Sequence, residues 1–233
     1  MKNFHIALLL VLGVCLTACS SKFQKAPIDD IIRDMPEGEV FSIILHDMDA
    51  EGTFSYTYYH QYQLIVGNDE NIESELTEWI EVSEEEFNKY VNDMGMEIAA
   101  RDSTGTLTKS VAPPGYNNYI GNRRYGSWHS SGGQSFWVFY GQYAFMSSMF
   151  RLATWPVNRG YYDGWRGSTG TYYGPGGTYY GTSSAYNQTR NTSSTWNSKP
   201  SSFRDQVRSR ASRSTGRTGT SSSSRSRSGG FGK

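Results

Sequence analysis

The chain has 233 residues, enough for one or two domains, and its formal net charge is zero. This sum conceals a division, because residues 22–102 contain 20 acidic and five basic residues, whereas residues 103–233 contain two acidic and 16 basic ones. The two longest apolar runs, residues 4–14 and 136–150, are shorter than the roughly 18 residues that a membrane-spanning helix needs. The composition therefore disfavours a membrane-spanning protein and predicts an acidic half joined to a basic half.

The first 19 residues have the three parts of an export signal, which are a basic start at Lys2, an apolar run, and small residues before a cleavage point. The run ends in Leu16-Thr17-Ala18-Cys19, which resembles the lipobox of bacterial lipoprotein precursors. The resemblance covers only this signal. It implies that residues 1–18 are a signal peptide and that a diacylglycerol is attached to the sulfur of Cys19. An ordinary secretory signal is the alternative, since small residues precede the cut in both kinds.

The lipoprotein resemblance also implies a location. Serine after the lipidated cysteine, here Ser20, goes with sorting to the outer membrane in a cell that has two membranes. We therefore expect a cell-envelope protein held by lipid at Cys19, facing the periplasm, with residues 19–26 as a tether. Cys15 lies in the removed piece, so the mature chain has no disulfide, no cysteine nucleophile and no thiolate metal site.

Residues 27–102 are expected to form an acidic α+β domain. Pro27 and the acidic residues that follow it are typical of a helix start. Apolar residues then keep the spacing of one helix face, namely Ile28, Ile31, Ile32 and Met35. The β-branched and aromatic runs at residues 40–45 and 53–66 predict two strands, paired across a turn at residues 47–52.

The rest of the acidic domain adds a strand, a helix and a returning strand. Residues 76–82 have the composition of a strand, and Ser83 with Glu86 forms a capping box that begins a helix. We expect Gly95 to end this helix as a left-handed cap, and residues 96–100 to form the returning strand. The expected fold class is α+β, a three- to four-stranded antiparallel sheet with two helices.

The middle of the chain is aromatic. Residues 103–134 are rich in turn formers and are expected to be a linker. In residues 135–155 the aromatic side chains fit a broad helical stripe, which predicts a buried aromatic helix. We favour packing of this helix on the sheet of the acidic domain. The alternatives are the membrane interface beside the lipid, and a membrane span, for which the run from Phe136 to Phe150 is short.

Residues 156–233 are rich in Gly, Tyr, Ser and Arg and poor in aliphatic residues, so a disordered basic tail is expected. Such a composition would suit nucleic acid in the cytoplasm. An exported lipoprotein meets little nucleic acid, so the expected partners are anionic lipid, lipopolysaccharide or a cell-wall polymer. An alternative is that the tail binds the chain's own acidic domain.

Catalytic signals are weak. His46, Asp47 and Asp49 resemble part of a metal or acid/base site. They also lie at a predicted strand end, where a polar turn explains them equally well. His60 is expected on the polar face of a strand, and no established catalytic or phosphate-binding motif occurs. We expect a non-catalytic structural or interaction protein without metal or cofactor. The alternative is an envelope hydrolase or metal-dependent enzyme that uses His46, Asp47 and Asp49.

Overall fold

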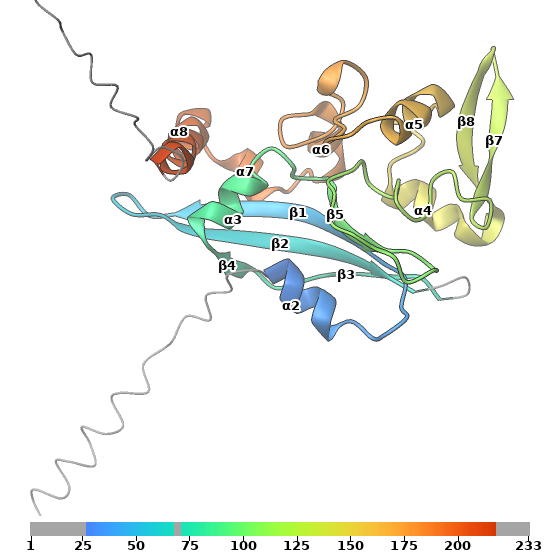
Figure 1. Ribbon diagram of the computed structural model, residues 1–233. Coiled ribbons are helices and arrows are strands. Elements are labelled where there is room, and N and C mark those ends of the chain that lie inside the picture. Colours follow the sequence, from blue (N-terminus) through green and yellow to red (C-terminus); the bar gives the residue numbers. More distant parts are fainter. Residues whose placement is uncertain (1–26, 68–70, 218–233) are drawn as a thin grey trace, which may run out of the picture.

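The computed structural model describes residues 27–67 and 71–217, with side chains as far as residue 210. Its main strands are β1 (Phe41–Glu51), β2 (Thr57–Val66), β3 (Glu73–Leu76), β4 (Ile80–Val82), β5 (Glu97–Arg101) and β6 (Leu107–Thr108). Within the described residues these form one antiparallel sheet in the order β3-β2-β1-β5-β6, and β4 also pairs with β2 (Figure 1). The expected mixture of helices and an antiparallel sheet is confirmed, and the sheet is larger than predicted.

Two helices of the acidic half lie close to their predicted positions. Helix α2 (Pro27–Asp34) buries Ile28 and Ile32, as its spacing predicts. Helix α3 (Glu84–Lys89) begins at the expected cap, where the Ser83 hydroxyl accepts from the Glu86 N–H over 2.9 Å. The prediction that α3 runs to Gly95 is wrong. The helix ends at Lys89, and the Gly95 N–H donates instead to the Leu45 carbonyl over 2.7 Å, so contact with β1 replaces the last helical turn.

Strand β1 runs through the predicted turn at residues 47–52, because its pairing with β2 continues to Glu51.

The expected polar position of His60 is also wrong. Its side chain is fully buried, its ring stacks on Phe87 with centroids 5.5 Å apart, and its Nδ1 lies 2.9 Å from the Tyr62 hydroxyl. Burial lowers the pKa of His60 to about 3, so the ring is neutral.

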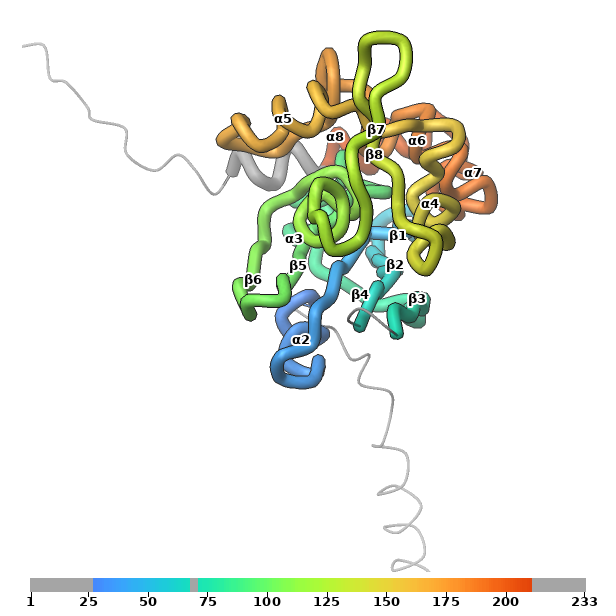
Figure 2. Tube along the Cα trace, turned by 90° about the vertical axis from the view of Figure 1, so that its right-hand side faces the viewer, coloured from blue at the N-terminus to red at the C-terminus, as the bar shows by residue number. Residues whose placement is uncertain are grey.

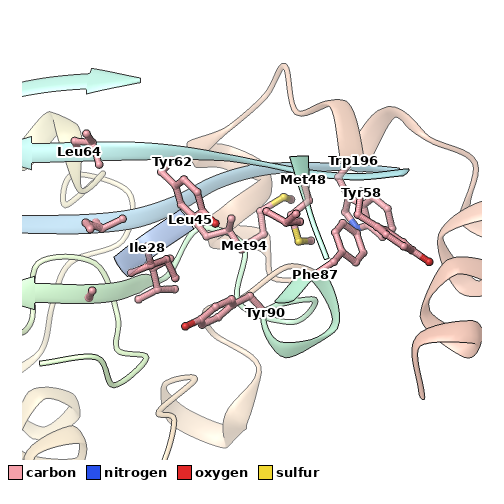
Figure 3. Close-up of a cluster of buried hydrophobic side chains, with 14 of the residues drawn as sticks. Ile28, Leu45, Met48, Tyr58, Tyr62, Leu64, Phe87, Tyr90, Met94 and Trp196 are labelled. Atoms are coloured by element: carbon pink, nitrogen blue, oxygen red, sulfur yellow. The ribbon is translucent and has the colours of Figure 1, made fainter. Parts of the chain in front are cut away.

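Successive residues of β1 face two different clusters of buried side chains. Ile43 and Leu45 belong to the first cluster, and Ile44 belongs to the second. Because neighbouring residues of a strand point to opposite faces, the two clusters cover the two sides of the sheet. In the first cluster, shown in Figure 3, Phe87 of α3 meets Trp196 from near the end of the described chain.

The predicted linker at 103–134 and aromatic helix at 135–155 are wrong. These residues contain the hairpin β7 (Gly126–Ser131) and β8 (Gln134–Phe139), then a 3₁₀ turn η1 (Gly141–Tyr143) and the short helix α4 (Ala144–Met149). Gly132 and Gly133 both have positive φ, at 57° and 80°, which is the conformation of a tight hairpin turn. Figure 2, viewed from the hairpin end, shows β7 and β8 in front of the sheet.

The aromatic residues of this region form the second cluster on the sheet. Its buried members include Tyr116, Tyr119 and Tyr125 of the expected linker, together with Trp137, Phe139 and Phe150. They pack with Ile44 and Ile65 of the sheet. The favoured burial of this segment, on the sheet of the acidic domain, is therefore confirmed, although its conformation is largely not the predicted helix.

The predicted disordered tail at 156–233 is wrong as far as residue 217. The chain there forms α5 (Arg159–Arg166), η2 (Pro175–Gly177), α6 (Ala185–Arg190), α7 (Thr195–Ser198) and α8 (Ser201–Arg217). Aromatic side chains supply the core that the missing aliphatic residues cannot, since Tyr162, Tyr180, Tyr186 and Trp196 are all buried. Residues 218–233 lie outside the described residues. In the described part, no helix has the length and apolar character to cross a membrane.

Candidate functional site

A bulge in β1 determines where His46 and its neighbours point. Leu45 pairs with Tyr62 and Asp47 with Gln61, so His46 is an extra residue in the ladder. The insertion lets Leu45 and Met48, three residues apart, both enter the first cluster. His46 and Asp47 remain between them, outside that cluster.

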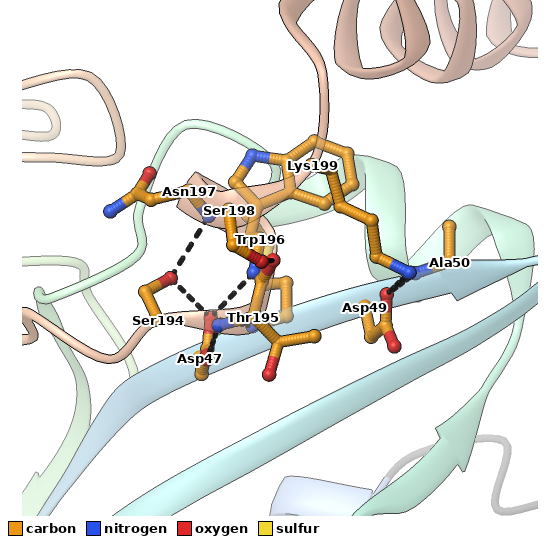
Figure 4. A network of polar contacts seen from close by, with 10 residues as sticks. Asp47, Asp49, Ala50, Ser194, Thr195, Trp196, Asn197, Ser198 and Lys199 are labelled. Atoms are coloured by element: carbon orange, nitrogen blue, oxygen red, sulfur yellow. Dashed lines mark hydrogen bonds and ion pairs between the residues drawn. The ribbon is translucent and has the colours of Figure 1, made fainter.

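Asp47 binds the segment that begins α7 (Figure 4). Its buried carboxylate accepts from the Ser194 hydroxyl over 2.8 Å, from the Thr195 N–H over 2.6 Å and from the Trp196 N–H over 3.3 Å. These backbone donors belong to the first turn of α7, where a helix has unsatisfied N–H groups. Asp47 thereby anchors α7 to the sheet.

Asp49 extends this attachment along β1. Its carboxylate lies 2.8 Å from the Lys199 ammonium, and both side chains are largely buried. At the other end, the Asn191 side-chain amide donates to the His46 carbonyl over 3.1 Å. Residues 191–199 therefore follow the part of β1 that, within the described residues, has no β5 partner. Both carboxylates of the predicted site hold the chain's own C-terminal segment.

The His46 ring lies apart from these carboxylates. It lines a small cavity with two arginines, Arg151 and Arg190, from the region predicted to be a helix and a tail. Burial, and secondarily the positive charge of Arg190, lower the pKa of His46 to about 4. Sequence reasoning missed both arginines, because nothing local in the sequence places them beside a histidine of β1. In the described residues, no group of three or more His, Cys, Asp or Glu side chains could hold a metal ion.

A cleft with a volume of about 580 Å³ is lined by residues from both halves of the chain. The acidic half contributes Lys89, Tyr90 and Asp93, and the basic half contributes Lys109, Trp165 and Arg166. The three cations are exposed, and hydroxyl groups of Ser168, Thr169 and Thr171 complete the wall.

The charges in this cleft are unevenly compensated. Lys109 lies 2.5 Å from Asp29, and Lys89 lies 3.8 Å from Glu86. The Arg166 guanidinium lies 5.8 Å from the Tyr162 ring centroid, against an aromatic face. Asp93 accepts from the Tyr173 hydroxyl over 2.5 Å, and burial raises the pKa of this carboxyl. The cleft thus presents exposed positive charge beside two aromatic rings.

The lipobox residues and Ser20 lie outside the described residues. The sequence matches no protein-family model, and no curated protein and no solved structure is significantly similar to the chain.

Proposed function

We propose that this protein is anchored in the cell envelope through lipid on Cys19 and binds an acidic envelope polymer in the cleft lined by its two halves. Binding rather than catalysis is its role. The location is supported by the Leu16-Thr17-Ala18-Cys19 signal. The observation that carries the binding function is the grouping of Lys89, Lys109 and Arg166 around one large cleft.

An acidic saccharide chain suits this cleft better than a flat lipid surface, because the site is concave. Cations attract its phosphate or carboxylate groups, and the hydroxyl groups offer hydrogen bonds to sugar. The half-buried Trp165 adds apolar surface for the sugar rings. Since Lys109 and Arg166 are exposed, their attraction for the polymer is screened by salt.

The cleft is tested by co-sedimentation of the full chain with purified cell-wall polymer and with lipopolysaccharide vesicles. The double variant Lys109→Gln with Arg166→Gln is expected to lose most of the binding. Arg159→Gln is the matched control, because Arg159 is an exposed cation on the same helix as Arg166 but is not among the residues that line the cleft. Equal binding by the double variant and the control would contradict the proposal.

The anchor is tested separately. Mass spectrometry of the protein extracted from membranes should show an N-terminal peptide that begins at Cys19 and carries acyl chains. The Cys19→Ser variant should appear in the soluble fraction. A peptide cleaved elsewhere and without lipid would favour the ordinary secretory signal.

A second candidate function is that the basic end of the chain shields the acidic half. The position of α8 supports it. Arg210 donates to the Phe54 carbonyl over 3.3 Å and stacks 4.8 Å from the Tyr56 ring centroid. Burial, and secondarily the charge of Glu84 on α3, raise the pKa of Tyr58, whereas the charge of Arg210 lowers it, so both charges act at Tyr58. If shielding is the function, high salt should expand the monomer in solution scattering. An unchanged radius would count against it.

A further inference from the structure

A second cavity, separate from the cleft, lies beside the bulge of β1. It has a volume of about 250 Å³ and is lined by His46, Gln63, Ser148, Met149, Arg151 and Arg190. Ser148 and Arg151 are exposed, so the cavity opens to solvent at that side. It brings the bulge of one strand together with the ends of two helices, α4 and α6.

Arg190 is buried in this cavity with part of its hydrogen-bonding capacity unused. Its side chain is only 9% exposed. Its Nη2 donates to the Gln63 side-chain oxygen, whereas Nε and Nη1 have no hydrogen-bond partner in the described part of the chain. A buried cation without a full set of partners is costly, so this guanidinium favours a partner that the described residues do not supply.

Arg151 brings a second positive charge to the same place, on an unusual backbone. It follows α4 with φ of 56°, and it is the only residue other than glycine with positive φ in the described ranges. A left-handed residue after a helix is normally glycine, and a side chain there carries strain. Burial, and to a smaller extent the charge of Arg151, lower the pKa of the Arg190 guanidinium.

Among the described residues that line the cavity there is no carboxylate to balance these charges. Arg190 is the last residue of α6, where the helix dipole offers some compensation, but that helix has only six residues. His46 adds a polar nitrogen, because its Nδ1 is buried and has no partner in the described residues. Ser148 adds a hydroxyl group.

We propose that this cavity is a binding site for an oxyanion, a phosphate or carboxylate group, held between Arg190 and Arg151 with His46 and Ser148 beside it. The anion supplies the partner that Arg190 lacks and relieves the repulsion between the two guanidinium groups. The volume accommodates such a group together with a few water molecules. This site is independent of the polymer cleft, because the two share no lining residue.

Inorganic phosphate, sulfate and acetate are suitable probes on the full chain, each compared with chloride at constant ionic strength. Thermal unfolding should show a rise in Tm with at least one of the three, and the imidazole resonances of His46 should shift in the same titration. A response to phosphate or sulfate alone identifies a phosphoryl-type ligand, and a response to acetate alone identifies a carboxylate. If none of the three moves Tm or the His46 resonances, the proposal is overturned.

Two arginine variants separate binding from folding. Arg151→Gly places glycine where φ is positive, so without anion its Tm should equal or exceed that of the wild type, while anion affinity falls at least tenfold. Arg190→Lys keeps a charge and should bind more weakly than the wild type but better than Arg190→Gln. Arg159→Gln should bind normally. Wild-type affinity in a folded Arg151→Gly protein would overturn the assignment of Arg151.

Discussion

The Thr195 N–H donates to the Asp47 carboxylate over 2.6 Å, across 148 positions of the chain. This bond and its two neighbours fix α7 on β1 and, with it, the fully buried Trp196. Asp47, which the sequence suggests as a catalytic or metal-binding carboxylate, thus attaches the C-terminal segment to the sheet.

Replacement of Asp47 should therefore destabilise the protein. Asp47→Ala leaves four donors without their acceptor, the Ser194 hydroxyl and the N–H groups of Met48, Thr195 and Trp196. It is expected to lower the free energy of unfolding by about 3 kcal/mol. Asp47→Asn keeps one acceptor oxygen and should cost less. Urea unfolding followed by tryptophan fluorescence measures both. A loss below about 0.5 kcal/mol in Asp47→Ala would show that α7 is held mainly by Trp196.

The C-terminal segment is expected to be part of the folded body as far as α8. A chain that ends at residue 190 lacks Trp196 and Val207, which are both 0% exposed, and should lose at least about 5 kcal/mol of stability or fail to fold. A chain that ends at residue 217 keeps both and should unfold within about 2 °C of the full chain. Circular dichroism melting curves compare the two. Equal melting temperatures would mean that the first cluster does not need Trp196.

Glu97 should make the protein less stable as the pH rises. Burial raises the pKa of this carboxyl from 4.5 to about 7, although hydrogen bonds from Ser42, Asn117 and Gly115 partly offset the effect. The folded state therefore binds the proton more tightly than the unfolded chain does. The resulting stabilisation is complete below about pH 4.5 and is lost as the pH rises through 7. Between pH 5 and 8 we expect a loss of about 2.5 kcal/mol from this group.

Glu97→Gln isolates this contribution. The lowered pKa values of His46 and His60 make the protein less stable as the pH falls, which is the opposite trend. Both histidines are also present in the variant, so their contribution cancels in the comparison. The difference in unfolding free energy between wild type and variant should thus move in favour of the variant as the pH is raised. Denaturant titrations at several pH values measure it. A difference that stays constant with pH would show that Glu97 is not titrating in this range.

Tyr119→Phe should stabilise the protein, unlike most substitutions of buried residues. The Tyr119 hydroxyl is buried in the second cluster and has no hydrogen-bond partner in the described residues. Removal of this hydroxyl should raise the free energy of unfolding by about 1 kcal/mol. Tyr116→Phe is the control, because its hydroxyl lies 3.3 Å from that of Tyr180, and its removal should cost about 1 kcal/mol. A larger loss in Tyr119→Phe than in Tyr116→Phe would contradict this account.

Local signals in the acidic half predicted where its two helices begin. The predicted strand at residues 76–82 is instead divided between the end of β3 and β4. The spacing of Ile28 and Ile32 determines which face of α2 is buried, and Ser83 begins α3 as the capping box predicts. The aromatic segment was harder, because Trp137 and Phe139 satisfy helical and alternating patterns alike. The tight turn formed by Gly132 and Gly133 favours a hairpin, and these two glycines are the sequence signal that indicates it.

The C-terminal half and the cationic cavity depend on long-range packing. A count of aliphatic residues predicted disorder, yet Tyr162 and Tyr186 bury aromatic rings in their place. Arg190 meets Gln63 only because residues 191–199 dock along β1. No local sequence pattern predicts the contact between Arg190 and Gln63. Neither the cavity nor the unpartnered atoms of the Arg190 guanidinium could therefore be predicted from the sequence.

The attachment of residues 191–199 to β1 also sets the order in which the protein can be completed. Trp196, which packs against Phe87, is synthesised 109 positions after it. The first cluster therefore stays open while most of the chain is made. If the chain is exported from its N-terminus, Trp196 arrives after Phe87 and all strands of the sheet. The contact between Trp196 and Phe87 can then form only once both residues are in the same compartment.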